Sequence, residues 1–225
     1  MISSSITYAK KIKVLLADGP QKAHKFHDTT PVLKQILDKV SDFETDLTRS
    51  SKESCADGSY KPDFSMYDVV VINEGYGAPG WPKATQKAFE EYMAKGGGLV
   101  TVHAANNCWP KWKEYNKMAG LGGWAGRNEK SGPYVYFDEE DKIIRDTSKG
   151  KGGPHGPDEL YDKLRGPAEN MTILASAHSK KTKRHEPTLM AISYKKGRVF
   201  HSILGHHIEQ IKEGSFVNTF LRGTE

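Results

Sequence analysis

The chain has 225 residues and a mass of 25.1 kDa, which suits one α/β domain. Its formal net charge is +5, but the densest basic cluster, Lys180–Arg184, lies in a predicted loop with no nucleic-acid-binding motif, so we expect no nucleic-acid partner. No apolar stretch reaches the roughly 18 to 20 residues that span a bilayer, and residues 1–11 lack the apolar core of a secretory signal. We therefore expect no membrane association, and both cytoplasm and periplasm remain open.

Strands and helices alternate in the first half of the chain. A strand over 11–17 precedes a helix that is capped by Thr29 or Thr30 and begins at Pro31, where a missing N–H costs nothing. The continuous run Val69–Ile72 is typical of a strand buried on both faces of a parallel sheet. We also predict strands over 43–47 and 98–103, a loop over 50–62 and a helix over 82–95. This order predicts a doubly wound, mostly parallel sheet flanked by helices.

The second half is less regular, and no internal repeat is found. We expect residues 1–225 to form a single domain, with a flexible segment over residues 1–10. The predicted elements are a helix over 109–118, a glycine-rich loop over 120–132, strands over 134–137, 172–177, 189–194 and 198–204, and a final helix over 216–221.

Polar side chains follow four of the predicted strands, at the points where the strands end. Such strand ends meet at one edge of a parallel sheet, which is where ligands bind in open α/β folds. If the strands are parallel neighbours, these side chains lie around one crevice. They are His24 and His27, Asn73 and Glu74, His103, Asn106 and Asn107, and His206 and His207.

The residue types predict three kinds of chemistry for that crevice. Imidazole can act as a general base, a proton shuttle or a metal ligand, and Glu159 and Tyr161 add a carboxylate and a phenol. His103 and His206 can equally be hydrogen-bonded structural histidines, and we expect His207 to point away. Asparagine and arginine side chains can bind sugar hydroxyls, and aromatic rings can pack on a sugar face or serve the core. The polar candidates are Asn106, Asn107, Arg127 and Asn128, and the aromatic ones are Trp81, Trp109, Trp112, Trp124 and Tyr161.

Cysteine chemistry is disfavoured. The bend after the strand that ends at His103 carries Ala104 and Ala105 where a thiol or hydroxyl nucleophile would stand, and Cys108 comes several residues too late. Cys55 and Cys108 have no metal-ligand spacing, although a disulfide between them remains open.

An ordered set of motifs identifies a family. Its segments are Gly98–Asn107, Gly126–Glu129, Asp158–Tyr161, Arg184–Pro187 and Gly197–His206. Together they resemble the bacterial ThuA-like (trehalose utilisation) family of the class I glutamine amidotransferase-like superfamily, which typically lacks the catalytic cysteine. Family members usually carry an extra segment before the Asp-Glu-Leu-Tyr motif, whereas here Pro157 runs straight into Asp158. Either this member has a deletion there or residues are missing near 157–158, and we favour the second interpretation.

The resemblance implies carbohydrate metabolism, with trehalose-type disaccharides or their 3-keto derivatives as substrates. It gives His103, Glu159 and His206 as catalytic residues, and as the ligands if a divalent metal such as zinc binds. A non-catalytic sugar-binding or regulatory module is the alternative. The partner is a small carbohydrate, and a homo-oligomer is possible. The expected substrate-binding residues are His24, His27, Asn106, Asn107, Trp124, Arg127, Asn128 and Tyr161.

Overall fold

The computed structural model describes residues 10–123, 126–131, 134–136, 142–144 and 155–225. In this part of the chain the main sheet has eight strands in the order β2-β1-β3-β4-β10-β9-β8-β6, and β5 pairs with β7 in a separate two-stranded sheet. Strands β2, β1, β3, β4 and β10 are parallel neighbours, and β9, β8 and β6 extend the sheet in antiparallel fashion. The predicted α/β fold with its mostly parallel sheet is therefore confirmed.

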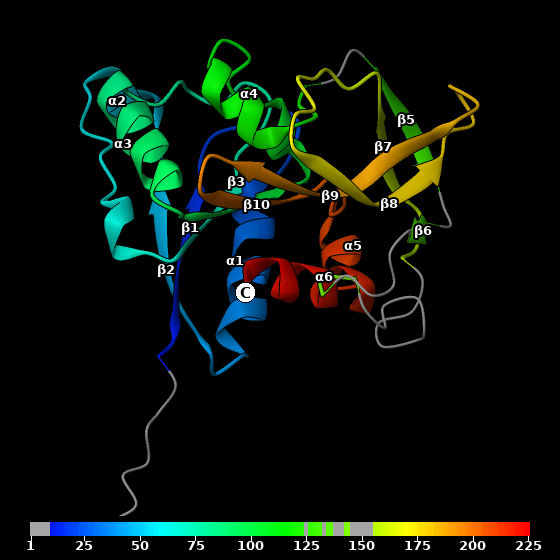
Figure 1. Ribbon diagram of the computed structural model, residues 1–225, viewed down its shortest axis with the longest axis horizontal. Helices are drawn as coiled ribbons and strands as arrows, with labels where there is room; N and C mark the ends of the chain where they lie inside the picture. The colour runs from blue at the N-terminus through cyan, green and yellow to red at the C-terminus, as the bar shows by residue number, and fades with distance from the viewer. Residues whose placement is uncertain (1–9, 124–125, 132–133, 137–141, 145–154) are drawn as a thin grey trace, which may run out of the picture.

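Helices cover both faces of the main sheet. In Figure 1, α1 and α6 lie below it and α2, α3 and α4 lie above it. The helices are α1 (Phe26–Asp38), α2 (Lys52–Ala56), α3 (Lys83–Ala94), α4 (Lys113–Ala119), α5 (Ile208–Ile211) and α6 (Gly214–Thr224). The strands are β1 (Ile12–Asp18), β2 (Phe43–Arg49), β3 (Val69–Asn73), β4 (Gly98–Val102), β5 (Gly126–Ser131), β6 (Tyr134–Tyr136), β7 (Asp158–Asp162), β8 (Met171–His178), β9 (His185–Tyr194) and β10 (Gly197–Ser202).

Several predicted boundaries and loops are wrong, among them the start of α4 at Lys113 rather than at Trp109. Helix α1 begins at Phe26 rather than at Pro31, which lies inside it. The predicted loop over 50–62 contains α2, which is opened by a capping box between Ser51 and Ser54. Strand β5 occupies part of the predicted glycine-rich loop, because it pairs with β7.

The three tryptophans Trp81, Trp109 and Trp112 belong to the core. Each is at most 7% exposed, and their rings pack against one another at centroid distances of 4.7 to 5.9 Å. Their indole N–H groups donate to Glu74, to the Pro79 carbonyl and to Glu90. The structure therefore supports their packing role and gives none of them a free face for a sugar.

No helix in the described part of the chain is long and apolar enough to cross a membrane.

Candidate functional site

His103 lies where β4 ends, at the first residue of a 3₁₀ turn, His103–Asn107. Its φ of 46° is in the left-handed region, which a residue with a side chain enters at a cost of about 1–3 kcal/mol and which is often found at functional sites. The ring Nδ1 lies 2.6 Å from the carbonyl oxygen of Ile203, which can only accept. Nδ1 therefore carries a hydrogen, and in the neutral ring Nε2 is the bare acceptor nitrogen.

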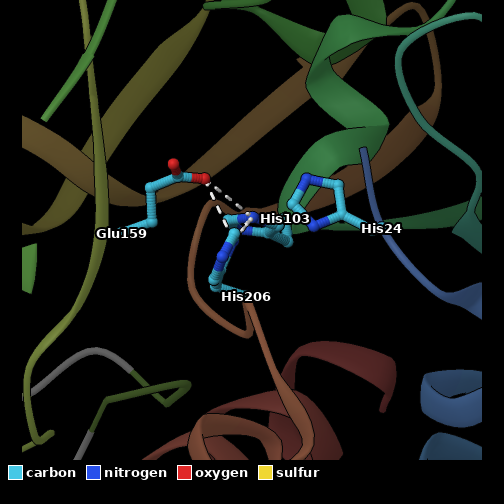
Figure 2. Close-up of side chains that lie close together, drawn as sticks. All are labelled: His24, His103, Glu159 and His206. Carbon is cyan, nitrogen blue, oxygen red and sulfur yellow. Dashed lines mark hydrogen bonds and ion pairs between the residues drawn. The ribbon is translucent and has the colours of Figure 1, made fainter. Parts of the chain in front are cut away.

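Three groups surround the bare nitrogen of His103. Tyr161 donates its phenol hydrogen to Nε2 over 2.9 Å, His206 Nδ1 lies 3.1 Å away and Glu159 Oε2 lies 3.4 Å away. Glu159 Oε2 is also 3.0 Å from His206 Nδ1. Figure 2 shows the carboxylate of Glu159 pointing toward the two imidazoles, with His24 on their other side. The parallel order of β4 and β10 brings His103 and His206 to one sheet edge, and β7 supplies Glu159 and Tyr161.

His24 joins this group from the loop between β1 and α1. Its ring meets those of His103 and His206 edge-on, at centroid distances of 4.7 and 4.9 Å. Burial, together with the neighbouring His103 and His206, lowers the pKa of His24 to about 3, so its imidazole is neutral at physiological pH. Burial opposes the charge of Glu159, but the adjacent His103 and His206 rings outweigh it and hold the pKa of Glu159 well below its usual range. Imidazoles beside a carboxylate can exchange protons or bind a cation.

Asp158 fixes the turn that carries His206. Its buried carboxylate accepts from the backbone N–H of Gly205 at 2.7 Å and of His206 at 3.2 Å. His155 Nε2 lies 3.0 Å from the same carboxylate, and His155 Nδ1 lies 2.9 Å from Ser215 Oγ on α6. Gly205 has a φ of 101°, which suits glycine at this turn. Neither His155 nor Asp158 is among the predicted site residues, although Asp158 directly precedes Glu159.

A cavity of about 290 Å³ opens beside the cluster, against His24 and His206. Lys25, Asp28 and Glu209 line it, as does His207, whose ring meets that of His206 edge-on at a centroid distance of 3.9 Å. This volume is at the small end of ligand pockets, and its lining of charged and imidazole groups suits a small polar ligand.

The other predicted residues lie in different surroundings. The His27 ring is exposed and lies on Phe26, outside both the cavity and the cluster. Trp124 is outside the described residues, and Arg127 and Asn128 lie in β5, where the register pairs Arg127 with Tyr161. Cys55 and Cys108 are free and buried, so the disulfide left open by the sequence is absent.

Asn106 and Asn107 are buried in the same 3₁₀ turn as His103. Within the described part of the chain, neither amide atom of Asn106 has a hydrogen-bond partner, nor has the amide nitrogen of Asn107. Residues i and i+3 eclipse one another in a 3₁₀ turn, so Asn106 lies on the side of the turn that carries His103. An unpaired buried amide destabilises the fold, which makes Asn106 available to a bound ligand.

We expect Asn106→Leu to separate stability from function. Removing two unpaired polar atoms should raise the free energy of unfolding by about 1 kcal/mol, or leave it unchanged. The same change should raise KM for a sugar substrate by about 10-fold. Asn116→Leu is the matched control, because Asn116 is bonded to the Pro110 carbonyl and to Arg165 and its loss should destabilise the protein. Urea unfolding and steady-state kinetics measure both effects, and an unchanged KM would contradict a ligand role for Asn106.

The sheet order and the strand-end site define a doubly wound α/β protein of the glutamine amidotransferase-like fold. A family model described as ThuA, trehalose utilisation, matches residues 13–225. The chain therefore belongs to the ThuA family, which supports a carbohydrate-related function.

Solved structures agree with this assignment. A putative ThuA-like protein from Parabacteroides merdae is 34% identical with a TM-score of 0.78, over 96% of this chain and 89% of that one. One from Bacteroides uniformis is 21% identical with a TM-score of 0.69, over 100% and 94% of the two chains. A cytoplasmic protein from Salmonella typhimurium, 16% identical over 93% and 97% of the chains with a TM-score of 0.60, shows the fold alone. No curated protein matches the sequence.

Proposed function

We propose that the protein is an enzyme of carbohydrate metabolism that acts on trehalose-type disaccharides or their 3-keto derivatives. The observation that carries this proposal is the meeting of His24, His103, His206, Glu159 and Tyr161 beside a cavity of about 290 Å³. These side chains come from separate segments and include bases and a proton donor within 3.4 Å of His103 Nε2. Such a set suits proton transfer, and membership of the ThuA family supports sugar as the substrate class.

Proton abstraction next to a carbonyl is the chemistry that best suits this arrangement. In a 3-keto glycoside the hydrogen on C2 is acidic, and the glycosidic oxygen on C1 is β to the carbonyl. A base of the cluster takes the C2 proton, and the electron pair passes through the enolate to expel the C1 oxygen, which takes up a proton. The Tyr161 hydroxyl donates to His103 Nε2 in the free protein, and it can donate to the carbonyl oxygen instead once that nitrogen has taken up the proton.

We expect His103→Ala to reduce kcat on 3-keto-trehalose by about 10²- to 10⁴-fold, the usual contribution of a positioned acid or base. The matched control is His178→Ala, because His178 is exposed at the end of β8 and outside the cluster. Product formation is followed by chromatography and mass spectrometry. Turnover unchanged by His103→Ala, or a wild-type protein that converts no keto-glycoside, would overturn the proposal.

A sugar-binding module is the second candidate, and Cys108 is the observation that favours it. The thiol is buried, donates to the Gly75 carbonyl, and has a pKa raised well above its usual value by that burial. The scaffold thus offers no cysteine nucleophile of the amidotransferase type. Saturable calorimetric binding of trehalose that leaves the sugar chemically unchanged would support this function over the enzyme.

A further inference from the structure

We propose that His24, His103, Glu159 and His206 bind one divalent metal ion of the zinc type. The proposal rests on the same site as the proposed function, and its test is independent of turnover. One ligand atom from each of the four side chains lies within 4.8 Å of the others, in the one such group found among the described residues. The family resemblance implies His103, Glu159 and His206 as the ligands of a metal, and the structure adds His24, which the sequence predicted to bind substrate.

The distances match the spacing of ligands around a metal. Metal–nitrogen bonds of about 2.0–2.1 Å at tetrahedral angles place two ligand atoms about 3.3–3.4 Å apart. His103 Nε2, His206 Nδ1 and Glu159 Oε2 form a triangle with edges of 3.1, 3.0 and 3.4 Å. Small movements of these side chains would therefore complete the coordination sphere, with His24 as the fourth ligand.

The hydrogen bonds around the ligands also fit a metal site. Metal-binding histidines usually donate their second ring N–H to a carbonyl or carboxylate, which fixes the tautomer. His103 does so with the Ile203 carbonyl, so its Nε2 faces Tyr161, His206 and Glu159. A metal ion bound there would take the Nε2 lone pair in place of the Tyr161 hydroxyl, together with the carboxylate of Glu159 and one ring nitrogen each of His206 and His24.

The donor set selects the class of metal. Three imidazole nitrogens and one carboxylate oxygen suit zinc and neighbouring first-row divalent metals, whereas Ca²⁺ and Mg²⁺ prefer oxygen ligands. The cavity borders His24 and His206, so an oxygen of a bound sugar can approach the metal from that side. The proposed metal therefore specifies the substrate further: a neutral sugar that places a carbonyl or hydroxyl oxygen toward the ion.

Metal titration of the full chain tests the proposal. Protein purified without chelator is analysed by elemental mass spectrometry, then stripped with chelator and titrated with Co²⁺ and Zn²⁺. We expect one ion per chain, a visible Co²⁺ absorption spectrum and its loss when Zn²⁺ is added. His24→Ala and Glu159→Gln should each weaken Zn²⁺ binding by more than the roughly 10- to 100-fold that loss of an outer-shell partner causes. His27→Ala is the matched control and should bind as the wild type does, since His27 lies outside the cluster.

Each outcome decides between the metal centre and its alternatives. Substoichiometric binding by the folded wild-type protein, or equal weakening by His27→Ala and His24→Ala, overturns the centre. Unchanged binding by His24→Ala overturns the four-ligand assignment, with circular dichroism confirming that each variant is folded. Full keto-glycoside turnover by a wild-type protein that binds no stoichiometric metal would overturn the metal centre and leave the proposed function standing. Stoichiometric Zn²⁺ binding by a protein that converts no keto-glycoside would support the metal centre and overturn the proposed function.

Discussion

Asp158→Asn is expected to lower the free energy of unfolding by about 3–5 kcal/mol, the usual cost of breaking a buried charged network. The carboxylate is 1% exposed and accepts from the backbone N–H groups of Glu159, Gly205 and His206. An asparagine offers one acceptor oxygen instead of two, so its NH₂ group would face at least one of these donors. Urea unfolding measures the loss of stability.

The same substitution should disturb the site, because Asp158 joins the strand of Glu159 to the turn of His206. We expect kcat on 3-keto-trehalose and Zn²⁺ affinity to fall together, by about 10- to 100-fold in affinity. Asp158 acts as a positioning residue, so the loss should persist under conditions where the variant is fully folded.

Asp162→Asn provides a matched control on the same strand. Asp162 is also buried in β7, and it forms an ion pair with Lys181 rather than contacts with the turn of His206. We expect its kinetics to match the wild type. Equal losses in both variants would show that the effect comes from β7 as a whole rather than from the contacts of Asp158.

The contribution of Asp158 to the stability of the protein changes with pH in one direction. Burial opposes its charge, but hydrogen bonds from His155 and from the Gly205 N–H, together with nearby His103, lower the pKa of Asp158 below its usual value. The stabilisation linked to this shift is therefore present above the ordinary aspartate pKa and is lost as the pH falls through the lowered value. Asp158→Asn should remove this part of the acid sensitivity.

The parallel half of the fold follows from local sequence. Runs such as Val69–Ile72 and Leu99–Val102 are continuous and apolar, so they predict buried strands whose ends share one edge. Because β1, β3, β4 and β10 are neighbours, the predicted meeting of His103 and His206 at that edge follows from sheet order alone.

The β5–β7 sheet could not be predicted in this way. The five residues of β7, Asp158–Asp162, are all buried, yet three of them are acidic, so no apolar pattern marks the strand. Their burial depends on distant partners, namely the His155 ring, the backbone of the His206 turn and Lys181. The position of His24 likewise depends on tertiary contacts. A histidine in a polar loop can be exposed to solvent or bind a ligand, and the sequence does not separate the two.

The tryptophans show that residue type alone does not predict whether a side chain binds sugar or packs in the core. An aromatic side chain near a predicted sugar site suits either a sugar face or the core, and only packing separates the two. Here the packing of Trp81 on Phe64 and Phe89 decides for the core. The same cluster encloses Glu74, whose burial the sequence did not reveal.

Glu74→Gln is expected to stabilise the protein increasingly as the pH rises from about 4.5 to 8. Glu74 is fully buried at the end of β3, and one of its oxygens accepts from Trp81 Nε1 at 2.9 Å. Burial raises the pKa of Glu74 to about 8, against the lowering effect of the Trp81 hydrogen bond. At neutral pH the folded protein therefore holds a protonated carboxyl group, which the unfolded chain would ionise.

The sign follows from proton linkage. Unfolding releases a proton between the unfolded pKa near 4.5 and the folded pKa near 8, so the free energy of unfolding falls by up to about 1.4 kcal/mol for each pH unit in that window. The total approaches about 5 kcal/mol at and above pH 8. Glutamine keeps the acceptor for Trp81 and cannot ionise, so the variant should match the wild type near pH 4.5 and exceed it at pH 8.

His201 makes the free energy of unfolding fall as the pH decreases, so it limits the pH range in which the effect of Glu74 can be measured alone. Burial lowers the pKa of His201 to about 4, so its contribution to stability is lost as the pH falls from 6.5 through that value. Urea unfolding between pH 6.5 and 8 therefore isolates the effect of Glu74. Glu90→Gln is the matched control, since Glu90 accepts the same kind of bond from Trp112 but is only half-buried. A wild-type unfolding free energy that stays level while Glu74→Gln gains nothing would show that Glu74 is ionised in the folded protein, and that the aromatic core tolerates a buried charge.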